Sequence, residues 1–281
     1  MNRKSVFASL LILSASLLVS PGGLFPQQEN PPGELSREQQ EEFLRTARIV
    51  RTRNIPVGVT DPQRATLSDG RITHDAQIQT VDIREAVYKT PKRTEFNFTD
   101  SYKYNIAGYR LDKILGLGMV PVSVKRRVGR KSAAVTWWID DVLMTEGERK
   151  SRKIPTPNPD HWNKQMYRVF VFDQLIYNTD RNSGNLAITK DWRIHMIDHT
   201  RAFRTHRALK SPKDMVQCDR KLLAALRGLT YETLAGELRP YLTKSQIKAL
   251  LARRDLIVEY FDDAVAEKGE QKVLYDLPPR L

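Results

Sequence analysis

The spacing of apolar residues predicts a first half of the chain that is built mainly from strands. A helix begins at Ser36, after which apolar residues recur with the helical period. Short β-branched runs between turn residues predict strands across residues 55–90. A second helix is predicted at 101–117, and two more strands are predicted at 121–127 and 132–140.

A proline-rich segment at residues 151–160 separates this half from a second half in which helical spacing dominates. Helices are expected at 161–178 and through 222–268. We therefore place an N-lobe at residues 31–150 and a C-lobe at residues 151–281. An order of mostly strands, a linker and then mostly helices predicts an α+β fold in two lobes.

The first residues differ in character from the rest of the chain. Arg3 and Lys4 precede an apolar run over residues 6–19, and small residues with proline and glycine follow it. This pattern is typical of a secretory signal peptide, and the run is shorter than the ~20 apolar residues of a membrane-spanning helix. We expect residues 1–30 to be a cleaved signal peptide with a flexible leader, and the protein to be secreted or periplasmic.

Three polar residues of the C-lobe are expected to meet at one place. Asp180 and Asn185 lie in a polar loop, and Asp198 follows two short strands predicted at 186–189 and 192–197. Because these strands form an antiparallel hairpin, the loop before the first strand and the residue after the second lie at the same end. For the loop on its own, an ordinary turn rich in Asp and Asn is the alternative.

Two carboxylates and an amide suit a hard cation such as Mg²⁺, which proteins hold with one or two carboxylates plus substrate phosphates. In phosphoryl transfer the cation neutralises phosphate charge, while a separate carboxylate accepts the proton of the attacking hydroxyl. On this scheme Asn185 and Asp198 bind the metal, and Asp180 orients or deprotonates the nucleophile. Arg181 pairs with a carboxylate or with phosphate, and we count it with Asp180 as a catalytic candidate.

The charge of the chain widens the range of partners without choosing one. Lys and Arg outnumber Asp and Glu by 46 to 33, which permits an anionic acceptor or an anionic membrane surface. No nucleic-acid-binding motif is present, so no nucleic-acid partner is expected. Cys218 is the single cysteine, which excludes an intrachain disulfide and a cysteine-rich zinc site. Transition-metal ligation by His195 and His199 is an alternative at the same hairpin.

The segment Tyr-Asn-Thr-Asp-Arg-Asn-Ser-Gly-Asn-Leu at residues 177–186, with Ile197 and Asp198 downstream, resembles the catalytic and metal-binding loops of phosphatidylinositol kinase-like enzymes. It also resembles a set of secreted bacterial proteins of the same atypical kinase superfamily. The resemblance implies a two-lobed protein-kinase-like fold that uses ATP with Mg²⁺ or Mn²⁺. It implies that Asp180 is the catalytic aspartate and that Asn185 and Asp198 are the metal ligands. The usual Asp-Phe-Gly triplet reads Asp-His-Thr here, which puts the switching behaviour of that triplet in doubt.

The resemblance extends to the N-lobe only through its layout. Residues 86–89 (Ala-Val-Tyr-Lys) resemble the strand that ends in the nucleotide-binding lysine, which makes Lys89 the candidate phosphate contact. A solvated lysine at a strand end is the alternative. Asn105 stands where the acidic partner of that lysine is expected, and Glu95 and Asp100 are the nearest upstream acids that can substitute.

Two further N-lobe features are candidates for nucleotide contact. Trp138 and Ile139 lie where the last strand passes to the inter-lobe connector, an edge that contacts adenine in a kinase. Packing of the tryptophan in the core or on a sheet face is the alternative. Gly58 and the turn at residues 68–70 are weak candidates for covering phosphates, because no Gly-x-Gly-x-x-Gly pattern is present.

The predicted function is a kinase-like phosphotransferase that uses ATP to phosphorylate a hydroxyl group on a protein, a lipid or a small molecule, and a monomer is expected. A secreted pseudokinase that binds without catalysis is the alternative, and Asn105 in place of an acid favours it. Adenylyl transfer on the same fold is a third possibility.

Overall fold

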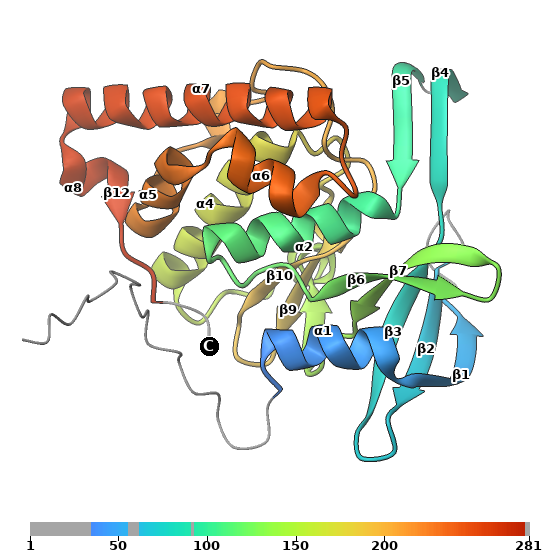
Figure 1. Ribbon diagram of the computed structural model, residues 1–281. Coiled ribbons are helices and arrows are strands. Elements are labelled where there is room, and N and C mark those ends of the chain that lie inside the picture. The colour runs from blue at the N-terminus through green and yellow to red at the C-terminus, as the bar shows by residue number, and fades with distance from the viewer. Residues whose placement is uncertain (1–34, 56–61, 91–92, 279–281) are drawn as a thin grey trace, which may run out of the picture.

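The computed structural model describes residues 35–55, 62–90 and 93–278, which fold into two lobes joined by a short connector (Figure 1). The predicted signal peptide and Gly58 lie outside the described residues. In the described part of the chain, no helix combines the length and the apolar character needed to cross a membrane.

The N-lobe is organised around one antiparallel sheet with strand order β1-β2-β3-β7-β6. Its strands are β1 (Arg48–Asn54), β2 (Gln63–Ser68), β3 (Thr73–Gln79), β6 (Ser123–Val128) and β7 (Lys131–Trp137). One face of the sheet is apolar and buried, with Ala65, Leu67, Ala76 and Ile78 in the same core as α1. The period-2 alternation of strands therefore leaves the other face of β1, β2 and β3 to polar residues.

Helix α1 (Arg37–Thr46) covers the apolar face of this sheet. It begins at Ser36, whose side chain and that of Gln39 form a reciprocal capping box. Phe43 and Leu44 point into the core, whereas Glu41 forms a buried hydrogen bond of 2.6 Å with the Tyr109 hydroxyl. Helix α1 is thereby fixed to both the sheet and the second helix of the lobe.

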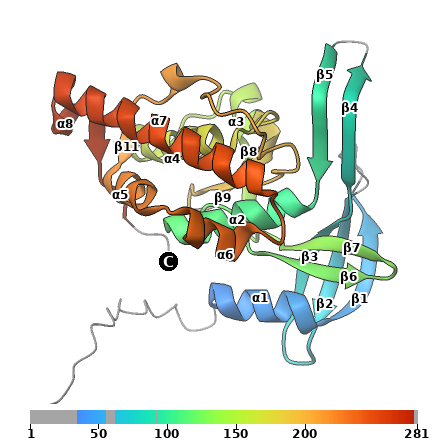
Figure 2. The ribbon, with the colours of Figure 1, turned by 45° about the horizontal axis from the view of Figure 1, so that its top comes forward.

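A two-stranded hairpin is inserted between β3 and the next helix. It consists of β4 (Asp82–Thr90) and β5 (Arg93–Ser101), and it forms a sheet of its own. Both views show it standing out from the five-stranded sheet (Figures 1 and 2). Helix α2 (Lys103–Leu115) follows and ends at Gly116, whose φ of 65° suits a residue without a side chain.

The C-lobe starts earlier than the sequence predicts. Strand β8 (Val142–Thr145) pairs with a C-lobe strand in the sheet β10-β9-β8, and α3 (Glu146–Ser151) packs beside it. The lobes therefore meet at residues 138–141, directly after β7, and not at the proline-rich segment 151–160. That segment is a surface loop inside the C-lobe, so its prolines mark a turn between two helices and not a lobe boundary.

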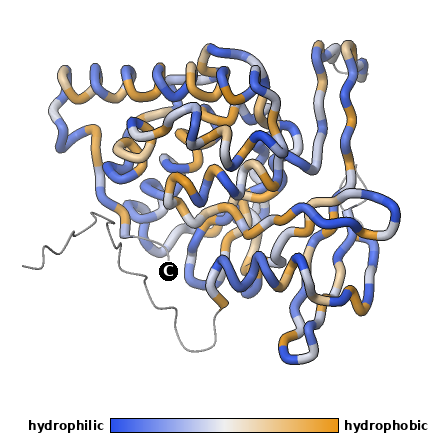
Figure 3. The backbone as a smooth tube through the Cα atoms, viewed as in Figure 1, coloured by the Kyte–Doolittle hydropathy of each residue, from blue (hydrophilic) through white to orange (hydrophobic). Residues whose placement is uncertain are grey.

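The rest of the C-lobe is mainly helical, as its spacing predicts. Its elements are α4 (Pro159–Ile176), η1 (Ser183–Asn185), β9 (Leu186–Thr189), β10 (Ile194–Met196), η2 (Pro212–Asp214), β11 (Cys218–Asp219), α5 (Arg220–Gly228), α6 (Tyr231–Leu238), α7 (Lys244–Lys268), α8 (Glu270–Val273) and β12 (Leu274–Tyr275). Hydrophobic and hydrophilic residues alternate along α7, and its apolar side packs on α4 (Figure 3). Cys218 is buried, and burial raises the pKa of its thiol, which makes it an unreactive core residue.

Candidate active site

The loop after α4 carries the first two predicted site residues. Helix α4 ends at Tyr177, which adopts a left-handed conformation with φ of 49°. The backbone N–H of Asp180 then donates to the Asn178 side-chain oxygen at 2.9 Å. Asp180 keeps 42% of its side chain exposed, so its carboxylate is accessible to a substrate. Its nearest ion-pair partner is the Arg201 guanidinium at 3.8 Å.

Arg181 binds a carboxylate and two backbone carbonyls. Its Nε lies 2.9 Å from an Asp173 oxygen, and one terminal nitrogen donates to the carbonyl oxygens of Asn185 and Ile197, both at 2.8 Å. Those carbonyls belong to the residues directly before β9 and directly after β10, so one guanidinium fixes the loop to both strands at the same end of the hairpin. Arg181 is therefore a positioning residue that pairs with a carboxylate, the first of its two predicted partners.

The hairpin brings Asn185 and Asp198 to one end, as its antiparallel pairing requires. The backbone N–H of Ile197 donates to the Asn185 carbonyl at 3.1 Å, next to Asp198. The Asn185 side-chain nitrogen donates to the Asp180 carbonyl at 3.1 Å, which leaves the amide oxygen as the atom that can bind a cation. Asp198 has a φ of 53°, and one of its carboxylate oxygens accepts a hydrogen bond from the Thr200 hydroxyl at 2.9 Å.

His199 is a buried structural residue. It is 1% exposed, and its Nε2 lies 3.0 Å from a terminal nitrogen of Arg181. Burial, together with the nearby Arg181 charge, lowers its pKa well below the usual value, so the ring is neutral and accepts a hydrogen bond from the guanidinium. A side chain at Gly108 would meet the ring at 3.3 Å, so helix α2 packs closely against it.

Metal ligation by the two histidines finds no support in the geometry. His195 lies on β10, and His199 binds Arg181 as described above. Among the residues that the structure describes, no three His, Cys, Asp or Glu side chains are arranged to hold a metal ion together. The donors at Asn185 and Asp198 instead fit a hard cation that draws its remaining ligands from phosphate and water.

A pair of neutral amides connects the N-lobe to this site. The Asn105 side-chain nitrogen on α2 donates to the side-chain oxygen of Gln79, the last residue of β3, at 2.6 Å. The Asn105 oxygen accepts from the backbone N–H of His199 at 2.7 Å. All three groups are buried, so this chain of hydrogen bonds joins β3, α2 and the Asp198 segment.

The structure places Lys89 away from the five-stranded sheet. It lies on β4 opposite Thr94, seven residues (89 − 82) beyond Asp82 at the base of the inserted hairpin. At ~3.3 Å per residue, that is about 23 Å along the strand from the base. The residue of the third sheet strand whose side chain reaches α2 is Gln79. The insertion therefore displaces the lysine expected at the nucleotide site.

Two of the other nucleotide-contact candidates, Trp138 and Ile139, lie on the connector as the sequence suggests, whereas the turn at residues 68–70 lies at the far end of the sheet. Trp138 and Ile139 are half-buried on the connector between β7 and β8. The Trp138 ring lies 4.0 Å from the guanidinium carbon of Arg64, whereas Trp137 stacks on His74 at 3.7 Å. The turn at residues 68–70 joins β2 to β3 at the strand ends opposite the β1–β2 connection.

Arginines occupy the polar face of the sheet. Arg53 pairs with Arg64 and Arg51 pairs with Thr66 across β1 and β2, while Asp75 and Gln79 alternate on the same face of β3. Arg51, Arg53, Arg64, Thr66 and Asp75 line a hollow of about 190 Å³. Three guanidinium groups face one carboxylate there, so the hollow is electropositive and lies on the sheet face that carries the Gln79–Asn105 pair.

The inserted hairpin contacts the site through Glu95, which the sequence suggested only as a substitute partner for Lys89. One Glu95 oxygen lies 2.9 Å from Arg201, and the other lies 2.7 Å from Arg204. Arg201 in turn faces Asp180. No local sequence pattern predicts these ion pairs, because Glu95 lies more than a hundred residues from Arg201 and Arg204.

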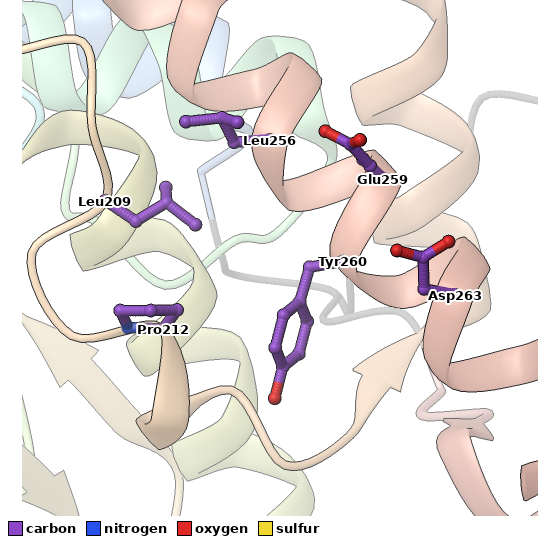
Figure 4. Close-up of a pocket in the computed structure, with 6 residues that line it drawn as sticks. All are labelled: Leu209, Pro212, Leu256, Glu259, Tyr260 and Asp263. Carbon is purple, nitrogen blue, oxygen red and sulfur yellow. The ribbon is translucent and has the colours of Figure 1, made fainter. Parts of the chain in front are cut away.

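A second cavity lies in the C-lobe between the 209–212 segment and α7, with a volume of about 340 Å³ (Figure 4). Its lining residues are Leu209, Pro212, Leu256, Glu259, Tyr260 and Asp263. None of them is a predicted site residue, so this cavity is separate from the catalytic constellation.

Comparisons with known proteins identify the fold. No protein-family model and no curated protein matches the sequence. A structure of hydra Fam20 with sugar has a TM-score of 0.66 and 15% identity, over 85% of this chain and 92% of that one. The Golgi casein kinase with Mn/ADP bound has a TM-score of 0.63 and 14% identity, over 87% and 80%. The Helicobacter pylori proinflammatory kinase CtkA has a TM-score of 0.53 and 10% identity, over 81% and 97%. The chain therefore has a two-lobed α+β kinase-like fold, which confirms the predicted fold class.

Proposed function

We propose that the protein is an ATP-dependent phosphotransferase that acts on a hydroxyl group. The observation that carries this proposal is the convergence of Asp180, Asn185 and Asp198 at one end of the β9–β10 hairpin. Asn185 and Asp198 offer an amide oxygen and a carboxylate to Mg²⁺ or Mn²⁺, and such a cation neutralises phosphate charge when bound. A structural neighbour that was crystallised with Mn/ADP supports this choice of ligands.

Asp180 has the accessibility that a general base needs. The hydroxyl of the acceptor donates its proton to the Asp180 carboxylate as its oxygen forms a bond to the γ-phosphorus, and ADP leaves with the electrons of the broken P–O bond. The Arg201 guanidinium lies 3.8 Å from the Asp180 carboxylate and orients it. Arg181 holds the loop, so it acts on the reaction only through the position of Asp180.

The arginine face compensates for the missing lysine. In protein kinases a lysine of the third strand pairs with a glutamate of the following helix and contacts phosphate. Gln79 and Asn105 make that connection here without charge. Positive charge for a polyphosphate instead comes from Arg51, Arg53 and Arg64 on the same face of the sheet.

A pseudokinase is the second candidate, and the neutral Gln79–Asn105 pair is the observation that favours it. A protein of this kind binds a nucleotide in the cleft but produces no phosphorylated acceptor. For either candidate we propose an exported protein, on the basis of the signal-peptide pattern at residues 1–30. The acceptor classes are a protein, a lipid or a small molecule.

Thermal unfolding of the purified protein with ATP, with and without Mn²⁺ or Mg²⁺, tests the nucleotide site. Saturation to 100 times the dissociation constant stabilises a protein by about 2.7 kcal/mol, and each kcal/mol raises the Tm by roughly 2–4 °C at this size. We expect a metal-dependent rise that disappears in Asp198→Ala and persists in Asp214→Ala, an exposed control. No rise with either metal contradicts the ATP-dependent phosphotransferase and leaves a kinase-like binding protein, whereas a rise without any phosphorylated product favours a pseudokinase that binds the nucleotide.

A further inference from the structure

Asp100 lies at the base of the inserted hairpin, next to the last residue of β5. The neighbouring Ser101 donates its backbone N–H to the Thr200 carbonyl at 2.9 Å. The Thr200 hydroxyl in turn donates to the Asp198 carboxylate at 2.9 Å. The hairpin base is thus fixed against the segment that carries Asp198, and Asp100 enters the site from the N-lobe side.

The Asp100 carboxylate is buried without a full set of partners. The residue is 8% exposed, and in the described structure its Oδ1 has no hydrogen-bond partner. A buried carboxylate oxygen left without a donor is costly, and in native proteins it calls for a bound ion or a similar explanation. This oxygen is therefore a buried acceptor without a donor, on a residue whose neighbour, Ser101, binds the Asp198 segment.

The electrostatic environment of Asp100 contains two other carboxylates. Burial raises its pKa, and the charges of Asp198 and Asp180 raise it further, partly offset by the Arg201 charge. Arg201 is already committed to Glu95 at 2.9 Å and faces Asp180 at 3.8 Å. The Arg201 guanidinium, whose Nε also has no hydrogen-bond partner in the described structure, offsets only part of the negative charge of the three carboxylates. A cation between the carboxylates would offset the rest.

We propose that Asp100 is a third protein ligand of the divalent cation held by Asn185 and Asp198. This inference rests on the proposed phosphotransferase site. The donor set is two carboxylates and one amide oxygen, and it suits Mg²⁺ or Mn²⁺. Because Asp100 comes from the inserted hairpin, the cation joins both lobes. The insertion is then part of the active site and not only a surface arm.

Direct Mn²⁺ titration of the full protein, followed by the electron paramagnetic resonance signal of free Mn²⁺, tests the assignment. We expect Asp100→Asn to weaken Mn²⁺ binding at least tenfold. The same variant should raise the Tm of the metal-free protein, because it removes a repulsive buried charge. Asp82→Asn is the matched control at the hairpin base, since the Asp82 carboxylate binds the Lys103 ammonium and the Ser101 hydroxyl, both at 2.7 Å, and not the cluster. It should leave Mn²⁺ affinity within about twofold of the wild type.

A second variant tests ligation itself. Asp100→Cys replaces an oxygen ligand with sulfur, so the preference for Cd²⁺ over Mn²⁺ should rise at least tenfold. The native background is low because the single cysteine, Cys218, is buried. Equal Mn²⁺ affinity in the wild type and in Asp100→Asn would overturn the Asp100 assignment and leave the proposed function standing. A lower metal-free Tm in Asp100→Asn would identify a structural role and would also overturn it. Absence of Mn²⁺ binding by the wild type, with and without ATP, would overturn the proposed function as well.

Discussion

The N-lobe and C-lobe sides of the proposed site differ in how their residues come together. The C-lobe side is local: Asp180, Asn185 and Asp198 are brought together by one loop, one hairpin and the Arg181 guanidinium. The N-lobe side is assembled from distant segments, with Gln79 and Asn105 26 positions apart across an insertion. The C-lobe side carries two carboxylates and an amide, whereas the N-lobe side joins β3 to α2 through two amides, where protein kinases have an ion pair.

On the proposed function, the C-lobe side carries out the chemistry and the N-lobe side binds phosphate. A carboxylate base and a cation site can operate only with their own residue types, so the C-lobe side tolerates little change. Phosphate charge can be met by any guanidinium or ammonium group within reach, so the N-lobe side can exchange one lysine for several arginines. Variants of the two sides should therefore fail in different ways.

The largest expected effect is on the C-lobe side. Asp180→Asn removes the proton acceptor, so the rate of phosphoryl transfer should fall by about 10²–10⁴-fold. The Tm rise with ATP and metal should remain, because the amide leaves Asn185 and Asp198 in place. Radiolabel transfer from ATP measures the first quantity and thermal unfolding the second. Asp160→Asn, an exposed position at the start of α4, is the control and should retain full activity. A rate unchanged in Asp180→Asn would remove Asp180 from the catalytic role.

The same contrast explains what the sequence could predict. The hairpin rule placed Asn185 and Asp198 together, because antiparallel pairing depends only on neighbouring residues. Gln79, which stands where a kinase has the lysine of the third sheet strand, could not be found in this way. Residues 86–89 have the right local pattern, yet they belong to β4, and the insertion that separates them from the sheet leaves no mark in their own composition.

Gln79 was missed, and Asp100 was named only as a substitute partner for the lysine, for a related reason. A polar residue at the end of an apolar alternation predicts a strand end, and its partner is decided by tertiary packing. The signal available in the sequence was that Ile78 ends a regular alternation in β3, before a second run of strand residues. Two consecutive strand patterns before one helix allow an inserted hairpin. These two patterns do not show whether β3 or β4 contributes the residue that contacts α2.

The next largest effect concerns the link between the two sides. Asn105→Ala leaves the Gln79 oxygen and the His199 N–H without their observed partner inside the protein. We expect a loss of about 2 kcal/mol in the free energy of unfolding, because unsatisfied buried polar groups cost roughly 1–3 kcal/mol. Denaturant unfolding measures this loss. Asn163→Ala, exposed on α4, should change stability by less than about 0.5 kcal/mol.

Restoring the ion pair tests the same link from the opposite direction. In Gln79→Lys with Asn105→Glu, the two new charges face each other, so the double variant should be more stable than the sum of the two single changes predicts. Additive effects would show that Gln79 and Asn105 do not act as a pair. Such a result would weaken the comparison between this connection and the ion pair of kinases.

The smallest expected effect is on the arginine face, because its three guanidinium groups share the interaction with phosphate. Arg51→Gln with Arg53→Gln should weaken ATP binding by about fivefold at low salt and by less at high salt, since exposed charges are screened over roughly 10 Å at 0.1 M salt. Arg130→Gln with Lys131→Gln removes the same net charge at the exposed β6–β7 turn. If the control double variant weakens ATP binding by the same factor, the arginines act only through net charge. If it does not, the hollow beneath β1 and β2 binds the phosphates locally, and the N-lobe side has kept its function while changing its residues.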